Sequence, residues 1–516
     1  MQEQQRRGRP QNVRRFVRDR SIERVVITNT HFDCLAGSQI VSLDIAALFR
    51  RSGVQQVIIL TDQVSPAMEQ LAQQHGIEIL SLLTSRWTER LPTRIDLLWG
   101  HHWPLVGAML LCAPVSLRYL VLSSLSAYEP LELNAFFATA ADLRVYNSRE
   151  TLQHVAPACV VDAPDALLPN SLADAWFQAG TPPVALGRIA ILSNHAPDEL
   201  MQAADILRAQ GVEVEPVGMS GKPRLMDPAA IDGFDAIVTI GHSVQKAMAR
   251  RRPVFLYDRF GGAGWLSPGQ LDDSEAVNHS GRDRLRRRPA DDLASEIVSG
   301  FSNALAGVEH LYAEAARRYR LDANLAALLR ALPRRRWRTV DAAAPVFARD
   351  RSAVQAYWQE KMPALPLPLT AIGNAPGLPM VRAVMTQEAA LGAGVRQLIT
   401  HYEDAPIMCT AVAVLAEVGG LPIQGLLGFE DGAYATEILF RRDDGLLFRG
   451  CVRPVPPAEG APPEMADTHF HTVLALAPTT RNFAISARTV AGDISVGHIR
   501  IDRQNDVAPG SGSKEV

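Results

Sequence analysis

Residues 234–267 read FDAIVTIGHSVQKAMARRRPVFLYDRFGGAGWLS, and this stretch decides the fold class. The apolar run over 236–240 predicts a buried strand, and the Gly-His-Ser triplet at 241–243 follows it as a tight turn. A helix is predicted over 244–250, and residues 253–256 give a second buried-strand pattern. Strand, turn, helix and strand in this order are typical of a parallel sheet in an α/β domain.

Ligands of open α/β sheets bind at the carboxyl ends of the strands, where this turn and the glycine-rich segment 261–264 are expected to lie. A helix start offers backbone N–H groups and the positive end of the helix dipole, and glycines let the backbone approach a diphosphate closely. We therefore predict a diphosphate site here, with an unliganded turn as the alternative. The predicted ligands are Gly241, His242, Ser243, Val244, Asp258, Gly261, Gly262, Gly264, Asn278, Ser280 and Gly281.

Composition points to a globular protein of several domains. The chain has 516 residues, of which 47% are hydrophobic and 21% charged, and its net charge is -3. This balance does not predict a nucleic-acid partner. No run of about 18 apolar residues and no secretory leader is visible, so a cytoplasmic location is expected. The five cysteines are far apart and form no CxxC pair, and we expect no metal site.

The order of patterns along the chain predicts three folded units. Gly53 and Gly76 follow the predicted helices over 38–51 and 67–75, at positions where a left-handed residue ends a helix. The predicted division is a basic flexible arm (1–21), a Rossmann-like domain (22–180), a second Rossmann-like domain (188–335), a proline-rich linker (336–370), a β-rich accessory domain (371–503) and a disordered tail (504–516). The arm is read as a solvated tail, and a peripheral membrane contact is the alternative.

Several phrases, taken in order, resemble the GT-B glycosyltransferases over residues 22–335. They are THFDCLAGSQIVSLDIAALFRRSG (30–53), ADLRVYNSRET (141–151), GHSVQKAMARRRPV (241–254), YDRFGGAGWL (257–266) and NHSGR (278–282). The last two resemble a bacterial subgroup. The resemblance implies an α/β fold of two facing Rossmann-like domains, with the acceptor on the first and a nucleotide sugar on the second. It also implies a nucleoside-diphosphate sugar as donor, no tightly bound cofactor, and a glycan or glycoconjugate acceptor in surface polysaccharide assembly.

Glycosyl transfer needs a group that takes the acceptor proton. His101 and His102 follow the predicted strand over 95–100, and an imidazole titrates near neutral pH, so these two are the leading base candidates. Asp33, just after the first strand, is a further candidate as base or as partner of a histidine, and His31 is a weaker one. A purely structural, hydrogen-bonded role is the alternative for each.

Two departures from the family keep other functions open. Members that retain the anomeric configuration often carry a glutamate pair in the donor domain, which 253–288 does not show, and Lys246 stands where others place a ribose-binding glutamate. Lysine cannot accept hydrogen bonds from ribose, but it can neutralise a phosphate. A noncatalytic nucleotide- or glycan-binding protein of the same shape is therefore the alternative, and a nucleotide-sugar epimerase with carboxylates in the cleft is a third hypothesis.

Overall fold

The computed structural model describes residues 12–341, apart from 85, 114, 128, 133–136, 157–160, 179, 195, 219–223, 260 and 285. Beyond them it describes 347, 350, 354, 357, 358, 381–386, 395–400, 420–429, 437–455, 467–475, 482–489 and 492–503. The predicted tail over 504–516 and the first eleven residues of the predicted arm lie outside these ranges. No helix within them is both long and apolar enough to cross a bilayer.

The first α/β domain is built on a parallel sheet in the order β3-β2-β1-β4-β5-β6-β7. Its strands are β1 (Arg24–Thr28), β2 (Gln56–Thr61), β3 (Glu78–Ser81), β4 (Arg94–Gly100), β5 (Ser116–Ser124), β6 (Leu143–Tyr146) and β7 (Asp165–Leu167). Its helices are α1 (Val13–Arg20), α2 (Gly37–Arg51), α3 (Pro66–Gln74), α4 (Trp87–Arg90), α5 (Trp103–Cys112) and α6 (Arg149–Val155), with short 3-10 turns η1 (Pro130–Glu132) and η2 (Ala138–Ala140). The next turn, η4 (Asp174–Phe177), lies within the predicted first domain but places Trp176 and Phe177 in the core of the second domain.

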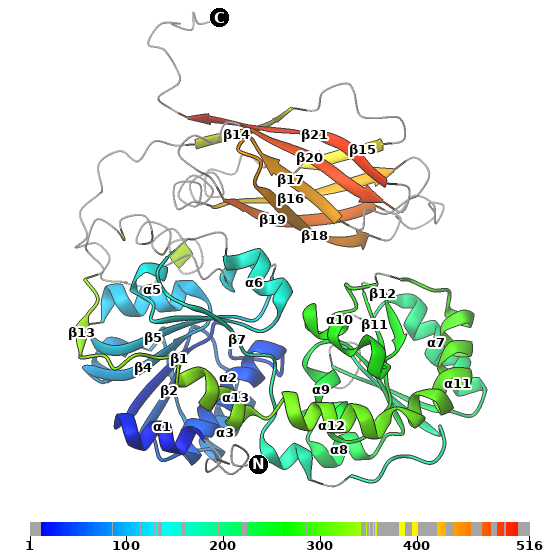
Figure 1. Ribbon diagram of the computed structural model, residues 1–516, viewed down its shortest axis with the longest axis horizontal. Coiled ribbons are helices and arrows are strands. Elements are labelled where there is room, and N and C mark those ends of the chain that lie inside the picture. The colour runs from blue at the N-terminus through cyan, green and yellow to red at the C-terminus, as the bar shows by residue number, and fades with distance from the viewer. Residues whose placement is uncertain are drawn as a thin grey trace, which may run out of the picture.

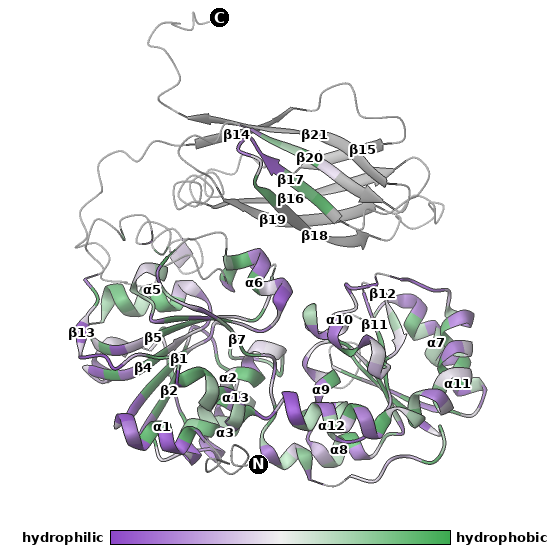
Figure 2. Ribbon diagram, viewed as in Figure 1, coloured by the Kyte–Doolittle hydropathy of each residue, from purple (hydrophilic) through white to green (hydrophobic). Residues whose placement is uncertain are grey.

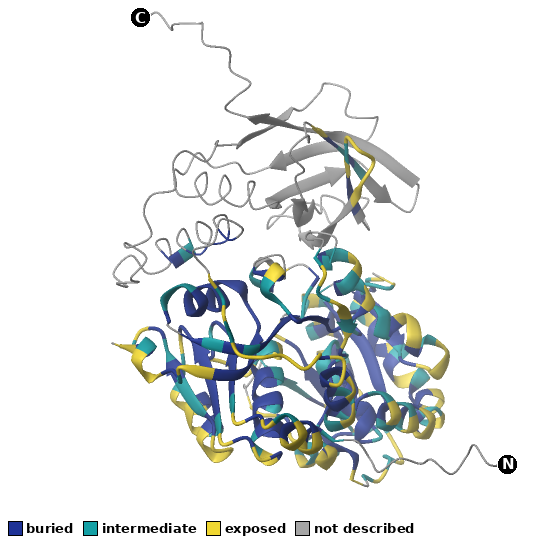
Figure 3. Ribbon diagram, turned by 60° about the vertical axis from the view of Figure 1, so that its left-hand side comes forward, coloured by how far each residue is buried: buried dark blue, intermediate teal, exposed yellow. Residues whose placement is uncertain are grey.

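Both faces of this sheet are buried, which explains its continuous apolar strands. Val25 and Ile27 of β1 point into the core on one face, and Val26 points into the core on the other. Figure 2 shows these strands as hydrophobic, and Figure 3 shows them buried beneath helices whose outer sides are exposed. The glycines predicted to end helices do so, since Gly53 has a φ of 101° and Gly76 a φ of 66°.

The second α/β domain has a five-stranded sheet in the order β12-β11-β10-β8-β9, in which only β12 is antiparallel to its neighbour. Its strands are β8 (Arg188–Leu192), β9 (Glu213–Val217), β10 (Ala236–Thr239), β11 (Val254–Asp258) and β12 (Gly261–Trp265). Its helices are α7 (Asp198–Ala209), α8 (Pro228–Asp232), α9 (His242–Ala249), α10 (Leu271–Ala276), α11 (Ala290–Ala306) and α12 (Val308–Arg318), with the turn η5 (Pro268–Gln270).

Two facing Rossmann-like domains form the GT-B arrangement, and Figure 1 shows them side by side. The chain returns to the first domain at its end, because α13 (Leu321–Leu329) places Leu325 and Leu329 in the core of the first domain. The prediction that 188–335 belongs wholly to the second domain is wrong at this helix. Its apolar face fits the first sheet, which the linear pattern of the sequence does not reveal.

Two other predicted segments also pack on the first domain. The predicted flexible arm is a helix over its second half, since Val13, Phe16 and Val17 of α1 are buried in the core. Arg14, Arg15 and Arg18 are exposed, whereas Arg20 donates hydrogen bonds to the Tyr119 hydroxyl and the Leu332 carbonyl. In the predicted linker, β13 (Arg338–Thr339) pairs with β5, Phe347 is buried against Phe137, and the Trp358 indole donates a hydrogen bond to the Pro104 carbonyl of α5. Apolar side chains spaced along an otherwise basic or proline-rich segment are enough to dock it.

The third unit is β-rich, as predicted. Its strands are β14 (Val381–Thr386), β15 (Val395–Thr400), β16 (Gly420–Phe429), β17 (Glu437–Arg442), β18 (Leu447–Val455), β19 (Asp467–Ala475), β20 (Asn482–Thr489) and β21 (Gly492–Arg503). They pair antiparallel in the order β14-β21-β20-β17-β18-β19-β16-β15. The sheet lies beyond α5 and α6 of the first domain (Figure 1).

Candidate functional site

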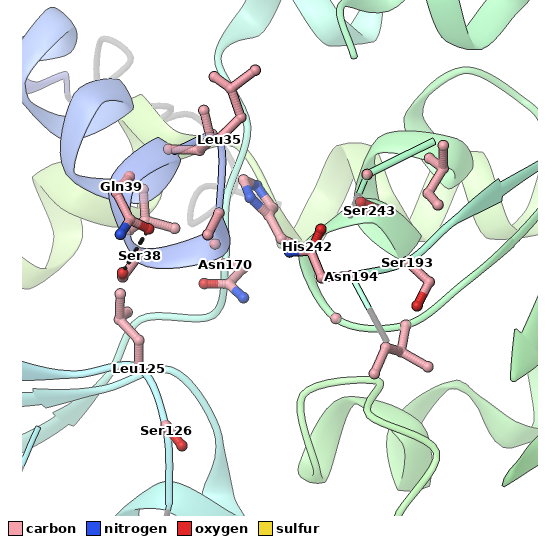
Figure 4. Close-up of a pocket in the computed structure, with 18 of the residues that line it drawn as sticks. Leu35, Ser38, Gln39, Leu125, Ser126, Asn170, Ser193, Asn194, His242 and Ser243 are labelled. Carbon is pink, nitrogen blue, oxygen red and sulfur yellow. Dashed lines mark hydrogen bonds between the residues drawn. The ribbon is translucent and has the colours of Figure 1, made fainter. Parts of the chain in front are cut away.

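A cavity of about 770 Å³ lies between the two α/β domains, within the usual size range of small-molecule sites. The first domain contributes residues that follow β1, β4 and β5, and the second domain contributes residues that follow β8, β10 and β11. Figure 4 shows Gln39 and Ser126 of the first domain on one side of the cavity, and Asn194 and Ser243 of the second domain on the other. The carboxyl ends of both sheets therefore face one shared space, as expected for α/β domains.

The second-domain wall is the start of α9. Gly241 precedes this helix with φ 63° and ψ −140°, a conformation open to glycine alone. The Gly241 N–H donates to the His279 carbonyl, and the Val244 N–H donates to the Gly241 carbonyl. Among the described residues, the N–H groups of His242 and Ser243 at the helix start have no backbone acceptor. Both residues line the cavity, so the turn presents donors of the kind that bind phosphate.

Asp258 and Asn278 complete this wall. Asp258 ends β11 and accepts hydrogen bonds from the Ser193 hydroxyl (3.0 Å) and the Arg259 N–H (2.8 Å). Burial raises the pKa of Asp258 to about 6 despite these hydrogen bonds. Asn278 has a left-handed φ of 56°, and its side-chain oxygen accepts from the Asn170 amide at 3.0 Å. The structure thus brings Gly241, His242, Ser243, Asp258 and Asn278 together around the cavity.

The predicted glycine-rich loop is instead an antiparallel strand, β12, and none of its residues lines the cavity. A Cβ on Gly262 would lie 2.0 Å from the Leu256 carbonyl oxygen, and one on Gly261 would lie 2.4 Å from the Arg286 carbonyl oxygen. On Gly264, a Cβ would meet the Glu296 carboxylate at 2.3 Å. These glycines allow close packing around β12, and the diphosphate role predicted for Gly261, Gly262 and Gly264 does not fit their positions.

Three further predicted ligands also lie outside the cavity lining. Val244 is fully buried in the core of the second domain. Ser280 and Gly281 form a turn that packs against β12, because a Cβ on Gly281 would lie 2.9 Å from the Gly261 carbonyl oxygen. The sequence placed this turn at the correct sheet edge but could not show which atoms face inward.

The two histidines after β4 have different environments. His101 is fully buried, accepts a hydrogen bond from the Trp99 indole at 3.1 Å, and has its pKa lowered to about 3, mainly by burial. It does not line the cavity, so the base role predicted for it does not fit. His102 does line the cavity and has a left-handed φ of 57°.

The hydrogen bonds of His102 define its tautomer. The backbone N–H of Thr30 donates to Nδ1 at 3.0 Å, so a neutral His102 carries its proton on Nε2. Nε2 faces the Glu132 carboxylate at 3.6 Å. A neutral imidazole in this tautomer has no vacant lone pair, so His102 is a hydrogen-bond donor here and does not suit the base role that we predicted.

His31, the weaker base candidate, lines the cavity, and its pairing with Asp62 was not foreseen. His31 follows β1 with a left-handed φ of 57°, and its backbone N–H donates to Asp62 Oδ1 at 2.6 Å. Its Nδ1 lies 3.6 Å from Asp62 Oδ2, and Asp62 is fully buried after β2. The carboxylate can therefore orient the ring. Asp33, two residues further on, is exposed and outside the cavity lining, so it is poorly placed for the role predicted for it.

The pairing of His31 with Asp62 had a weak signal in the sequence. β1 and β2 are neighbouring parallel strands, and polar residues follow each of them directly. Strand neighbours cannot be read from one sequence, so Asp62 did not stand out. Non-glycine residues with left-handed backbone are often found at functional sites, and three of those in this chain, His31, His102 and Asn278, line this cavity.

Two glutamates of the segment after β5 also line the cavity. Glu132 is buried and accepts hydrogen bonds from the backbone N–H groups of Leu125 and Ser126. Desolvation, followed by the nearby Glu132, raises the pKa of Glu129. The first-domain side of the cavity is thus rich in acidic groups and imidazoles.

No known protein-family model and no curated protein sequence matches this chain. Several solved structures align with it in part, and three of them are described here. A Listeria monocytogenes protein that carries the name UDP-N-acetylglucosamine 2-epimerase is 14% identical, covering 60% of this chain and 95% of its own, with a TM-score of 0.35. The glycosyltransferase SnogD from Streptomyces nogalater is 14% identical, covering 60% and 99%, with a TM-score of 0.29. TarM is 12% identical, covering 56% and 58%, also with a TM-score of 0.29. TM-scores this low do not define the fold. The assignment of the fold therefore rests on the strand order and the domain arrangement described above.

Proposed function

We propose that this protein is a glycosyltransferase that moves a sugar from a nucleoside-diphosphate donor to a hydroxyl of a glycan or glycoconjugate. One observation supports this most directly. The start of α9, with its backbone N–H groups, and His31, which pairs with the buried Asp62, face the same cavity from opposite domains. The first can hold a leaving diphosphate and the second can take a proton, which are the two requirements of glycosyl transfer.

The proposed reaction assigns one role to each domain. His31, oriented by Asp62, removes the proton of the acceptor hydroxyl, and that oxygen forms a bond to the anomeric carbon of the donor sugar. The bond from the anomeric carbon to the diphosphate oxygen breaks, and the diphosphate keeps the electron pair. The N–H groups of His242 and Ser243 stabilise its charge. His102 and Glu132 would orient the acceptor, and surface polysaccharide assembly is the proposed setting.

The test is release of nucleoside diphosphate from a panel of nucleotide sugars, with glycan acceptors present. We expect His31→Ala to lower kcat by roughly 10²- to 10⁴-fold, the usual contribution of a general base. Stabilisation of the protein by the matching nucleoside diphosphate should remain, because His31 lies on the other wall. The matched control is His310→Ala, since His310 is exposed on α12. If no nucleoside diphosphate stabilises the wild type, the proposal is wrong.

The carboxylates in the cavity favour one second candidate, a nucleotide-sugar epimerase, which needs acidic groups near the sugar. Glu129 and Glu132 line the same wall as His31. Proton NMR of a nucleotide sugar incubated without acceptor separates the two reactions. A new sugar stereoisomer would support the epimerase, and transfer that depends on an acceptor would support the transferase. Tight nucleotide binding without either reaction would support a noncatalytic binding protein.

A further inference from the structure

Lysine is rare in this protein, and one lysine lies in the interdomain cavity. The sequence has 48 arginines but only four lysines, at 222, 246, 361 and 514. Lys246 belongs to α9, lines the cavity and is 8% exposed. It follows His242 by four residues, so both side chains lie on the same face of the helix. The Lys246 side chain therefore leaves the helix one turn after the N–H groups of His242 and Ser243, which face the cavity.

The Lys246 ammonium has no close anionic partner among the described residues. Lys246 forms no ion pair with a carboxylate of the described ranges, and its Nζ lies over the Trp176 ring, 5.3 Å from the centroid. Asp44, on α2 of the opposite domain, is the acid that acts on it through space, without a direct ion pair. Burial lowers the pKa of Lys246, and Asp44 only partly opposes this effect.

The other cations near the cavity are already paired. Arg224 lines the cavity but forms an ion pair with Glu215 at 3.3 Å. Arg282 follows the Asn278 turn, and its guanidinium donates three hydrogen bonds to the Glu150 carboxylate of the first domain. Lys246 is thus the cation at the described cavity wall whose charge is not balanced at close range.

A buried ammonium without an ion pair destabilises the protein until an anion approaches it. An anion at the start of α9 would contact the helix N–H groups and the ammonium together. We propose that Lys246 binds the diphosphate of the donor directly, as its cationic ligand. The identity of the donor in this inference rests on the proposed function. The presence of an anion site at Lys246 does not depend on it.

The first test uses wild-type protein and pyridoxal 5′-phosphate, whose phosphate directs its aldehyde to lysines of anion sites. The lysine amine and the aldehyde form an imine with loss of water, and added borohydride reduces the imine to a stable amine. With only four lysines, mass mapping of peptides identifies the labelled residue. We expect preferential labelling of Lys246 and protection by inorganic diphosphate. Equal labelling of all four lysines, or no protection, would overturn the proposal.

The second test measures binding of inorganic diphosphate by calorimetry. Lys246→Met keeps the length of the side chain and removes the charge, and we expect it to weaken binding roughly 10- to 100-fold, as for loss of a charged hydrogen bond. Lys246→Arg should retain part of the affinity, and Lys514→Met, near the end of the chain, is the control. The labelling test does not depend on whether these variants fold.

The outcomes separate this inference from the proposed function. If the wild type binds inorganic diphosphate and Lys246→Met binds it equally well, the assignment of Lys246 is wrong while the nucleotide site stands. If Lys246 is labelled and protected but no sugar is transferred, the anion site is supported and the transferase is overturned. If the wild type binds neither diphosphate nor nucleotide, both are wrong.

Discussion

A buried histidine can make the free energy of unfolding of this protein depend on pH. His279 is fully buried, with the Ser274 hydroxyl 2.9 Å from Nδ1 and the Tyr319 hydroxyl 3.2 Å from Nε2. Burial, with a smaller effect of Arg318, lowers the pKa of His279 to about 3. The ring is therefore neutral in the folded protein at a pH where it would be protonated in the unfolded chain. Such a group favours unfolding as the pH falls below about 6.5.

We predict that His279→Gln flattens the acid dependence of stability. Between pH 6.5 and 5 the wild-type histidine should cost roughly 2 kcal/mol of unfolding free energy, and glutamine, which does not titrate, should not. Denaturant unfolding at several pH values measures this slope. His310→Gln is the control at an exposed position, and its slope should match the wild type. Equal slopes for His279→Gln and the wild type would show that His279 is protonated in the folded state.

At the scale of elements, β12 depends on glycines that allow close backbone contact. The Leu256 backbone lies so close to Gly262 that a side chain at this position would have no room. We predict that Gly262→Ala lowers the unfolding free energy by about 3 kcal/mol, because β12 must move away from β11. Gly269→Ala, with nothing within 4 Å of the added Cβ, is the matched control. Equal denaturation midpoints for the two variants would contradict the packing role of Gly262.

The whole molecule is held together by contacts that join the two domains beside the cavity. Arg282 and Glu150 form a half-buried ion pair between a turn of the second domain and α6 of the first. The Asn170–Asn278 hydrogen bond lies at the cavity itself. The chain also crosses back through α13. The relative position of the two domains is therefore stabilised by a few polar contacts in addition to α13.

We predict that Arg282→Gln and Glu150→Gln each open the unliganded molecule, and that the double variant is no more open than either single one. The reason is that both substitutions remove the same interaction, with a coupling of roughly 1 kcal/mol. The radius of gyration from small-angle X-ray scattering measures the opening. Glu314→Gln, which removes ion pairs to Arg317 and Arg318 within α12, should leave the radius unchanged. Additive effects of the two single variants would contradict the coupling.

The sequence by itself determined the βα units, the helix ends at Gly53 and Gly76, and the sheet edge where Ser243, Asp258 and Asn278 meet. These features follow from local periodicity and from the rule that the carboxyl ends of parallel strands share one edge. The position of His102 at the cavity could be inferred for the same reason.

Only the tertiary structure decided which of these groups face the cavity and what they can do. The tautomer of His102 and the pairing of His31 with Asp62 depend on strands and turns that are distant in sequence. The packing role of Gly262 depends on how closely β12 folds back on β11. The docking of α1 and α13 on the first domain likewise depends on which apolar face finds a partner. Local sequence fixes the backbone pattern of each unit, whereas burial and hydrogen-bond partners arise only when separate units pack together.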